Sequence, residues 1–408
     1  MRPLSHAWLH RFAILTALAT LVLIGIGGLV TSHGAGMAVP DWPNSYGYNM
    51  FTFPVSMWIG GVLYEHSHRL AGSVVGFLTL VLALWLNGRP AAKWLRWGSV
   101  VVLALGLATS LSTKVKLDNV IFLLGTGAVG FGISFVWPLH EPISPRMARF
   151  GLLALILVIV QGILGGLRVT AIADWLGIFH GTLAQCFFVL ICALALVTSR
   201  WWNELHARSP SAAVPAPLRR FLLVTTLLIL GQLALGASMR HQHAGLAVPD
   251  FPLAHAKVWP ATDAVSLDAY NSARRDHREF KPITAGQIYL HMAHRIGALA
   301  VFGHVLGCLI KLRRSVGSGH PLARGAAGWF ALICLQFGLG IWTVWSNKAA
   351  DIATLHVLVG AASLVTGALL TLVATTWGNG SGSQLAEMQR GTAIAAPGSL
   401  APGMGARL

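Results

Sequence analysis

The sequence predicts an all-α polytopic membrane protein built from two tandem four-helix bundles, with an extra helical hairpin in the first half. Composition is the first reason: 55% of the 408 residues are hydrophobic and only 10% are charged, whereas soluble domains carry about 25% charged residues. The second reason is a set of apolar runs long enough to cross a bilayer. The third is a repeat, because AVPDWP at 38–43 recurs as AVPDFP at 247–252.

Eight apolar runs have about 17 to 25 residues, the length of helix that crosses roughly 30 Å of hydrocarbon. They are 12–30, 64–86, 150–167 and 175–197 in the first half, and 221–237, 288–310, 326–345 and 352–374 in the second. The first run resembles a signal peptide in length, but it has no clear small-residue cleavage site and a repeat motif begins within its far end. We therefore expect a retained helix.

An insert in the first half has no counterpart in the second. Segments 98–112 and 120–137 are both apolar and are separated by the polar turn TKVKLDN. The flanking segments RPAAKWLRW and HEPISPRMAR are basic, so the insert crosses the membrane twice or not at all. We expect a hairpin and ten spans in total. A pair of short interfacial helices is the alternative, because the first segment is barely long enough to span.

The domain boundaries follow from this pattern. Residues 1–200 form the N-terminal repeat with its insert at 98–148, residues 201–219 an inner linker, and residues 220–376 the C-terminal repeat. The tail 377–408 is rich in Gly, Ser, Ala and Pro, which predicts disorder. Each half contains an even number of crossings, so the two copies have the same orientation, related by a pseudo-twofold axis along the membrane normal.

The distribution of basic residues predicts a cytoplasmic N-terminus. With that orientation the inner loops and tails hold 17 Lys and Arg against 3 acidic residues, while the outer loops hold 8 against 8. This asymmetry is the positive-inside signal of a multi-pass protein of the cell (inner) membrane. It accounts for most of the net charge of +16, so the charge does not imply nucleic-acid binding.

Four histidines lie at similar depth, about four to six residues inside the outer ends of their predicted helices, two in each repeat. They are His68, His180, His294 and His356. A single histidine at membrane depth is most often a hydrogen-bonded packing residue, but ionisable residues there are rare, and a matched set of four indicates a shared role. Imidazole is a common axial ligand of haem iron, and a four-helix bundle with one histidine on each of two helices can clamp the ring. Zinc fits less well, because no carboxylate or cysteine cluster completes a tetrahedral shell.

One position breaks the repeat. Glu65 precedes His68 by three residues, on the same helix face, whereas the matching position in the second half is His291. A carboxylate near a haem edge can accept a proton or stabilise a developing cation. The alternative is a glutamate that caps the helix N-terminus through the dipole. This asymmetry predicts one catalytic haem and one auxiliary haem.

The ordered motifs resemble haem A synthase, the CtaA/Cox15 family. They are GGLVTSHGAGMAVPDWP, EHSHRLAG, GGLRVT, DWLGIFHGTLAQ, HAGLAVPDFP, HMAHRIGA and DIATLHVLVG. The resemblance covers nearly the whole chain except the insert and the tail. It implies oxidation of the ring methyl group of haem O to the formyl group of haem A, by successive hydroxylations and loss of water.

The resemblance also implies roles for individual residues. By position, His294 and His356 would ligate a haem b cofactor, while His68 and His180 would hold the iron of the substrate haem. Glu65 would be the catalytic carboxylate. The implied partners are haem O, membrane lipid, an electron donor that the sequence does not identify, and, as candidates, haem O synthase and cytochrome oxidase assembly factors.

The chain departs from the family in its cysteines. Many bacterial relatives carry a cysteine pair in the first outer loop, but residues 31–63 contain none. The four cysteines, Cys186, Cys192, Cys308 and Cys334, all fall in apolar helices and are expected to be small core residues. A thiol role is therefore in doubt.

Two arginines and a second function stay open. Arg69 and Arg295 directly follow their histidines and could neutralise haem propionates or the motif residues Asp41 and Asp250. The alternative function is a dihaem cytochrome b-like electron-transfer or quinol-oxidising subunit. A transporter with parallel repeats would explain the duplication but not the histidines. The remaining histidines, among them His66 and His241, have no partner at equal depth in the other repeat and are expected to be surface or packing residues.

Overall fold

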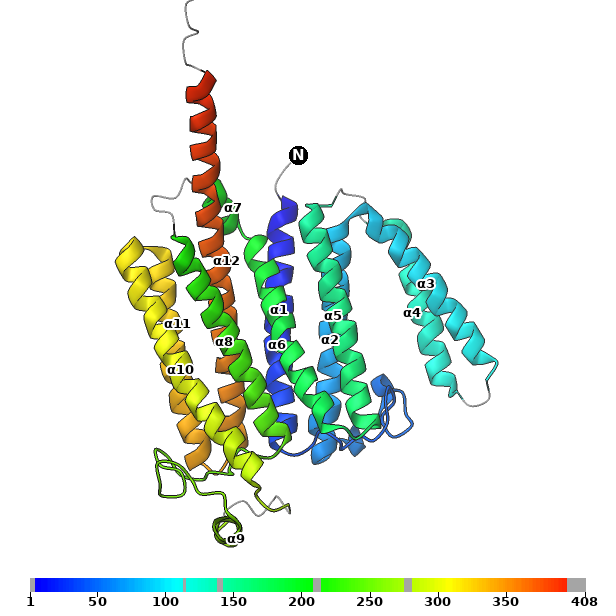
Figure 1. The fold of residues 1–408 in the computed structure, drawn as a ribbon. Coiled ribbons are helices and arrows are strands. Elements are labelled where there is room, and N and C mark those ends of the chain that lie inside the picture. The colour runs from blue at the N-terminus through cyan, green and yellow to red at the C-terminus, as the bar shows by residue number, and fades with distance from the viewer. Residues whose placement is uncertain (1–3, 113–114, 138–141, 208–213, 275–280, 395–408) are drawn as a thin grey trace, which may run out of the picture.

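A computed structural model describes residues 4–112, 115–137, 142–207, 214–274 and 281–394, and in these residues the chain is helical (Figure 1). Ten of the helices are long and apolar enough to cross a membrane, which confirms the predicted polytopic all-α class. The α-helices are α1 Leu4–Ser32, α2 Gly61–Asn87, α3 Arg89–Ser110, α4 Leu117–Val136, α5 Pro145–Thr170, α6 Asp174–Val197, α7 Arg200–Ala207, α8 Ala216–His241, α9 Ala264–Ser272, α10 Ala285–Val316, α11 Pro321–Trp345 and α12 Ala350–Ile394. Two short 3₁₀ helices, Met50–Thr52 and Val55–Met57, lie in the loop before α2.

The long helices form two adjoining groups of four. In the first group α1, α2, α5 and α6 pack around a ring, and in the second α8, α10, α11 and α12 do the same. The groups meet where α1 packs on α12 and α6 packs on α8 and α12, as the side-by-side helices in Figure 1 show. These pairings are those that the predicted repeat requires, with α1, α2, α5 and α6 matching α8, α10, α11 and α12.

The insert is a helical hairpin, as expected. Helix α3 has 22 residues and α4 has 20, enough to cross the hydrocarbon core at 1.5 Å per residue. The first helix begins nine residues before the apolar run, because RPAAKWLRW continues it from Gly88, whose φ of 58° suits glycine. The hairpin stands to one side in Figure 1, and its tip is tied to the first loop by Asn49 Nδ2 donating to Asn119 Oδ1 at 2.9 Å.

The apolar core occupies the end of the bundles away from the long loops 33–60 and 242–284. In the first group it gathers around Leu82, Leu86 and Ile191, and in the second around Leu222, Leu312 and Trp329, all at most 1% exposed. The opposite end, which we call the loop end, carries the site described below. Local signals position the helices there: Thr284 and Gln287 form a capping box that starts α10.

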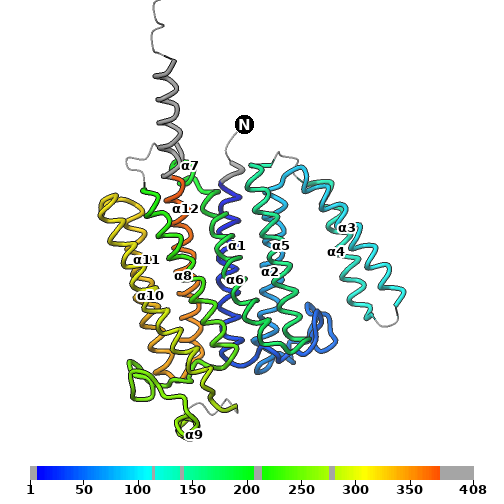
Figure 2. The backbone as a smooth tube through the Cα atoms, viewed as in Figure 1, coloured from blue at the N-terminus to red at the C-terminus, as the bar shows by residue number. Residues whose placement is uncertain are grey.

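The structure adds detail to the predicted linker, tail and cysteines. Helix α7, residues 200–207, overlaps the start of the predicted linker 201–219. Helix α12 is assigned to Ile394 and residues 395–408 lie outside the described residues, so the disorder expected for the tail 377–408 stays a prediction. Figure 2 traces the backbone of the two helix groups as a tube. Cys334 is exposed on α11 rather than in the core, since the periodicity of an apolar helix in a membrane does not separate core from lipid-facing positions.

The depth of the histidines also changes. His294 lies nine residues after Ala285, the first residue of α10, and His68 lies seven residues after Gly61. His180 and His356 each lie six residues after the starts of α6 and α12. Helices α2 and α10 each begin three residues before their apolar runs, so His68 and His294 lie further from the helix ends than the predicted four to six residues, whereas His180 and His356 lie within that range.

Candidate functional site

One large cavity lies at the loop end of the bundles. Its volume is about 1460 Å³ and it is lined by both groups of helices, including all four predicted histidines. A typical pocket for one small molecule has roughly 300–1,000 Å³. The two separate pockets expected from the sequence are therefore joined, because small residues such as Gly28, Gly181 and Ala237 line the boundary between the halves.

The histidines of the first half face each other across this cavity. The ring centroids of His68 on α2 and His180 on α6 are 6.4 Å apart, and the rings are inclined by 76°. One metal ion bound by both rings at roughly 2.0–2.1 Å per nitrogen, with about 1.1 Å from nitrogen to ring centre, would separate the centroids by roughly 6–6.5 Å. The distance between the two rings therefore leaves room for one iron to be held between them.

Each of the four imidazoles lies against a glycine of the preceding helix in its group. A Cβ atom on that glycine would come within 3.0–3.3 Å of the histidine Cε1, closer than side chains normally pack. The pairs are Gly27 with His68, Gly165 with His180, Gly236 with His294, and Gly340 with His356. The glycine is thus what allows each ring to lie where it does.

A glutamine stands four residues before three of these glycines. Gln161 Nε2 donates to the carbonyl of His180 at 3.1 Å, and Gln232 Nε2 donates to the carbonyl of His294 at 2.8 Å. Gln336 Nε2 lies 3.4 Å from His356 Nε2. The corresponding residue of α1 is Leu23. The sequence analysis did not single out these glutamines as part of the site, although the repeated spacing Gln-x-x-x-Gly at 161, 232 and 336 would have identified them.

Three of the imidazoles keep a ring nitrogen without a protein partner. The Nδ1 atoms of His68, His180 and His356 are buried and make no hydrogen bond. Packing histidines at membrane depth are expected to satisfy both nitrogens. His66 packs between Phe53 and Trp58, and its Nδ1 lies 3.1 Å from Ser45 Oγ, but its buried Nε2 also has no hydrogen-bond partner. What distinguishes the three histidines from His66 is therefore their place in the wall of the cavity and their glycine contacts.

Glu65 lies at the cavity wall with both carboxylate oxygens engaged. It is 4% exposed; Oε2 accepts from the Val39 N–H at 2.8 Å and Oε1 from Arg69 Nη2 at 2.8 Å. It does not occupy the first turn of α2, so its contacts are not those of a helix cap. The matching His291 is 3% exposed, and its Nδ1 lies 3.2 Å from the Ala244 carbonyl oxygen.

The two arginines that follow the histidines bind the backbone of the repeated motifs. Arg69 donates to the carbonyl oxygens of Val39, Asp41 and Asn44 at 2.6–2.9 Å. Arg295 donates to the carbonyls of Val248, Asp250 and Leu253 at 2.5–3.3 Å. Neither arginine forms an ion pair within 4.0 Å with the carboxylate of Asp41 or Asp250, because peptide carbonyls of the turn are closer than the aspartate side chains; Asp250 still interacts electrostatically with Arg295.

The motif aspartates instead close their own loops. Asp41 accepts from the N–H groups of Tyr46 and Gly47 at 2.7 Å, and Asp250 accepts from those of His255 and Ala256 at 2.7 and 2.8 Å. Partial burial opposes ionisation of Asp250, but these two N–H donors hold the pKa of its carboxyl below the usual range. Each loop also contains a cis proline peptide, Trp42–Pro43 or Phe251–Pro252.

Two arginines and a histidine reach the cavity although the sequence placed them elsewhere. Arg168, Arg240 and His241 line it, because α5 and α8 continue beyond residues 167 and 237, where the apolar runs end. His241 lies against Gly177 of α6, in the other group of helices. It is therefore a residue of the cavity wall at the boundary between the halves.

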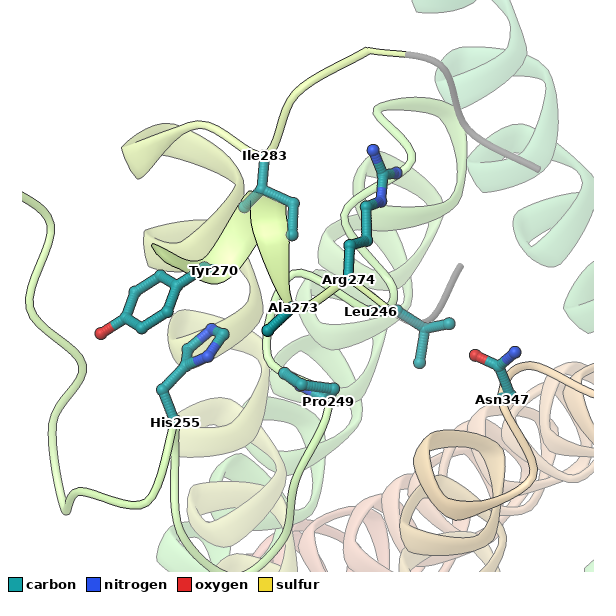
Figure 3. A pocket seen from close by; sticks show the side chains of 8 residues that line it. All are labelled: Leu246, Pro249, His255, Tyr270, Ala273, Arg274, Ile283 and Asn347. Carbon is teal, nitrogen blue, oxygen red and sulfur yellow. The ribbon is translucent and has the colours of Figure 1, made fainter. Parts of the chain in front are cut away.

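A second, much smaller cavity lies beneath α9. Its volume is about 60 Å³, and His255, Tyr270, Arg274 and Asn347 are among the side chains around it (Figure 3). The His255 and Tyr270 rings stack at 3.5 Å between centroids. This space has room for a few water molecules but not for a cofactor, so α9 serves here to cover the second loop.

Comparison with known proteins relates the chain to one family. The model of the COX15-CtaA family, described as cytochrome oxidase assembly protein, matches residues 123–369. The chain is 24% identical over 362 residues to a protein named heme A synthase from Alkalihalophilus pseudofirmus, covering 87% of this chain and 93% of that protein. It is 26% identical over 391 residues to heme A synthase from Shewanella oneidensis, covering 90% of this chain and 94% of that one. It is 25% identical over 362 residues to heme A synthase from Agrobacterium fabrum, covering 87% and 86%.

Proposed function

The chain belongs to the COX15-CtaA family, and from this membership and the geometry of the cavity we propose that it is a haem A synthase. The family and the ten candidate spans make it a multi-pass membrane enzyme of haem A biosynthesis. The proposed reaction oxidises the ring methyl group of haem O to a formyl group by successive hydroxylations and loss of water.

The observation that carries this proposal is the His68–His180 pair, with ring centroids 6.4 Å apart in a glycine-lined cavity. We propose that this pair holds the iron of the substrate haem and that His294 and His356 hold a haem b. The second pair has the same glycine contacts at Gly236 and Gly340. A haem b held by His294 and His356 would supply one-electron redox chemistry.

Glu65 is the proposed catalytic carboxylate. Its two oxygens are fixed by the Val39 N–H and by Arg69, so the carboxylate is held at the wall of the first half rather than free to rotate. A positioned carboxylate can take up a proton released as the methyl group is oxidised or stabilise developing positive charge. His291 at the matching position lacks that negative charge, which supports an auxiliary role for the second half.

The proposed location is the cell (inner) membrane with the N-terminus in the cytoplasm, supported by the excess of basic residues on one side. The loop end then faces outward. We propose the N-terminal repeat 1–200 as the substrate half and the C-terminal repeat 220–376 as the haem b half. An electron donor is required, and haem O synthase and cytochrome oxidase assembly factors are the proposed partners.

A dihaem cytochrome b-like subunit is the second candidate, favoured by the matched glycine contacts of all four histidines. Pigment extraction from the purified full-length protein separates the two. The synthase should contain haem b together with haem O or haem A, and should convert haem O when reduced in air. Two equivalents of haem b with no modified haem would overturn the proposal.

The ligand assignment has its own test. His294→Ala and His356→Ala should each abolish the low-spin haem b spectrum, because one axial ligand is lost. His304→Ala is the matched control, since His304 lies on the same helix with its Nδ1 2.9 Å from the carbonyl oxygen of Ala300. Retention of the spectrum in either ligand variant would refute the assignment.

A further inference from the structure

The wall of the large cavity is rich in arginine. Its lining includes Arg69, Arg168, Arg240 and Arg295 but a single acidic residue, Glu65, which pairs with Arg69. Uncompensated charge at membrane depth is expensive. Among the described residues Glu65–Arg69 is the one ion pair within 4.0 Å, so the cavity is suited to an anionic ligand.

Arg168 is the clearest case. It lies on α5 three residues after Gly165, the glycine that faces His180. Its Nε is buried without a hydrogen-bond partner, and its guanidinium fits against Gly36, where a Cβ atom would come within 2.6 Å of Nη1. It is also close enough to interact electrostatically with His68 and His180 and, with the opposite sign, with the carboxylates of Asp174 and Glu65. Its donors are therefore held beside the first histidine pair.

Arg240 approaches the same region from the other half. It lies on α8 four residues after Gly236 and crosses to α1, where its Nη2 donates to the Gly28 carbonyl at 2.8 Å and to Ser32 Oγ at 3.0 Å. Gly28 directly follows Gly27, the glycine against His68. Because both bonds use Nη2, the hydrogens on Nη1 and Nε are available to a ligand.

We propose that Arg168 and Arg240 bind the carboxylate side chains of the porphyrin ring held between His68 and His180. Guanidinium groups match carboxylates in shape and charge and can bind them in a bidentate manner. One arginine comes from each half, so the ring would be oriented by both repeats. This inference rests on the proposed function only in taking a haem as the ligand of the cavity.

The test is a titration of the full-length chain, purified from haem-deficient cells, with ferric protohaem and with its dimethyl ester. Each variant is scored by the ratio of its affinities for the two probes, so that partitioning of the ester into detergent cancels between variants. Arg168→Gln and Arg240→Gln should each lower the affinity for the free acid roughly 10- to 100-fold, the value of a hydrogen bond to a charged group, and leave the affinity for the ester unchanged.

Two further variants keep the result interpretable. Arg149→Gln, at the far end of the same helix α5, should leave the ratio as in the unaltered protein, since Arg149 Nε bonds only its own helix at Pro145. Arg168→Lys should restore much of the preference for the free acid, because it keeps the charge. An unchanged ratio in both glutamine variants, or an equal loss for both probes, would overturn the inference.

The outcome is independent of turnover. If the protein fails to convert haem O but the arginine variants lose the preference for the free acid, the proposed function fails and this inference stands. If haem O is converted but the ratio is the same in all variants, only this inference fails.

Discussion

Four glycines allow the rings of the four cavity histidines to lie close to a neighbouring helix. Each glycine lies on the helix before its histidine, and none could carry a Cβ atom without displacing the ring. Glycine in a helix costs about 1 kcal/mol relative to alanine, so its use at four matched positions indicates that the approach of the ring matters more than local helix stability.

Gly340→Ala should weaken the second histidine pair. The new Cβ would lie 3.2 Å from His356 Cε1, so the ring must shift and the axial bond should weaken; we expect at least a tenfold loss of retained low-spin haem. Gly338→Ala is the control, because nothing lies within 4 Å of its Cβ position on the same helix. Both changes favour the helix, so a loss confined to Gly340→Ala cannot come from helix propensity. Equal spectra in the two variants would contradict the expectation.

Glu65→Gln should separate catalysis from binding. The amide keeps an acceptor for the Val39 N–H but loses the negative charge, so haem should remain bound while oxidation slows by roughly 10²- to 10⁴-fold, the usual contribution of a general acid or base. Single-turnover conversion of haem O measures this beside the optical spectrum. Full turnover in this variant would return Glu65 to a structural role, in which it only ties Val39 and Arg69 to α2.

At the scale of elements, the two loops 33–60 and 242–284 share one construction. In each, an arginine of the following helix binds three carbonyls of the motif, and an aspartate closes the turn through two N–H groups. The sequence predicted the repeat from its recurring motif. Hydrogen bonds from a side chain to backbone carbonyls do not depend on which residues carry the carbonyls, so the role of Arg69 and Arg295 could not be predicted from a motif.

The second loop should open in acid. The carboxyl of Asp250 has a pKa below its usual value in the folded loop, so its contribution to stability is fully present above the unfolded pKa of about 3.9 and is lost as the pH falls through the folded pKa. Hydrogen exchange at the His255 and Ala256 amides, corrected for its intrinsic pH dependence, should rise below about pH 4. Asp250→Asn should raise it at neutral pH. Asp263→Asn, which removes a carboxylate of the same loop but keeps an N-cap acceptor for α9, should not.

Most of the cavity residues that the sequence analysis did not predict lie at the ends of helices. The apolar runs located the spans, the hairpin and the four histidines, because hydrophobicity and rare polar residues are visible in one sequence. They ended at residues 167 and 237, so Arg168 and Arg240 were counted among loop charges, whereas α5 and α8 extend to Thr170 and His241. The sequence analysis therefore did not predict that arginines in the last turn of a membrane-spanning helix line the cavity.

The hairpin α3–α4 should be dispensable for haem binding. None of its residues lines the cavity, and α2 ends at the same end of the bundle at which α5 begins (Figure 1). Replacing residues 89–136 by a short flexible linker should preserve both haem spectra. The control is the full-length protein with Gly98→Ala, where nothing lies within 4 Å of the new Cβ atom. It is expressed, purified and measured in the same way. Loss of one spectrum after the deletion would show that the hairpin supports α2 and the first loop through Asn119.

At the scale of the whole molecule, the joined cavity is what distinguishes this arrangement from two independent bundles. Both histidine pairs lie at the loop end of one bundle assembly, with Arg240 and His241 of the second half reaching α1 and α6 of the first. A ring in one half would therefore lie near residues of the other, a position suited to electron transfer between an auxiliary haem and a substrate haem.

The orientation of this assembly can be decided with reporter fusions. Ten spans place both termini on the same side, and the excess of basic residues predicts that this side is the cytoplasm. A fluorescent protein that matures only in the cytoplasm should fluoresce after residue 394. Alkaline phosphatase, which is active only outside, should be active when inserted in the second loop near residue 260 or in the hairpin turn after residue 112. Activity in the loop but not in the hairpin turn would mean that α3 and α4 do not cross the membrane, and activity at the C-terminus would reverse the whole orientation. The histidine layer would then open toward the cytoplasm, and the donor of electrons would have to be sought there.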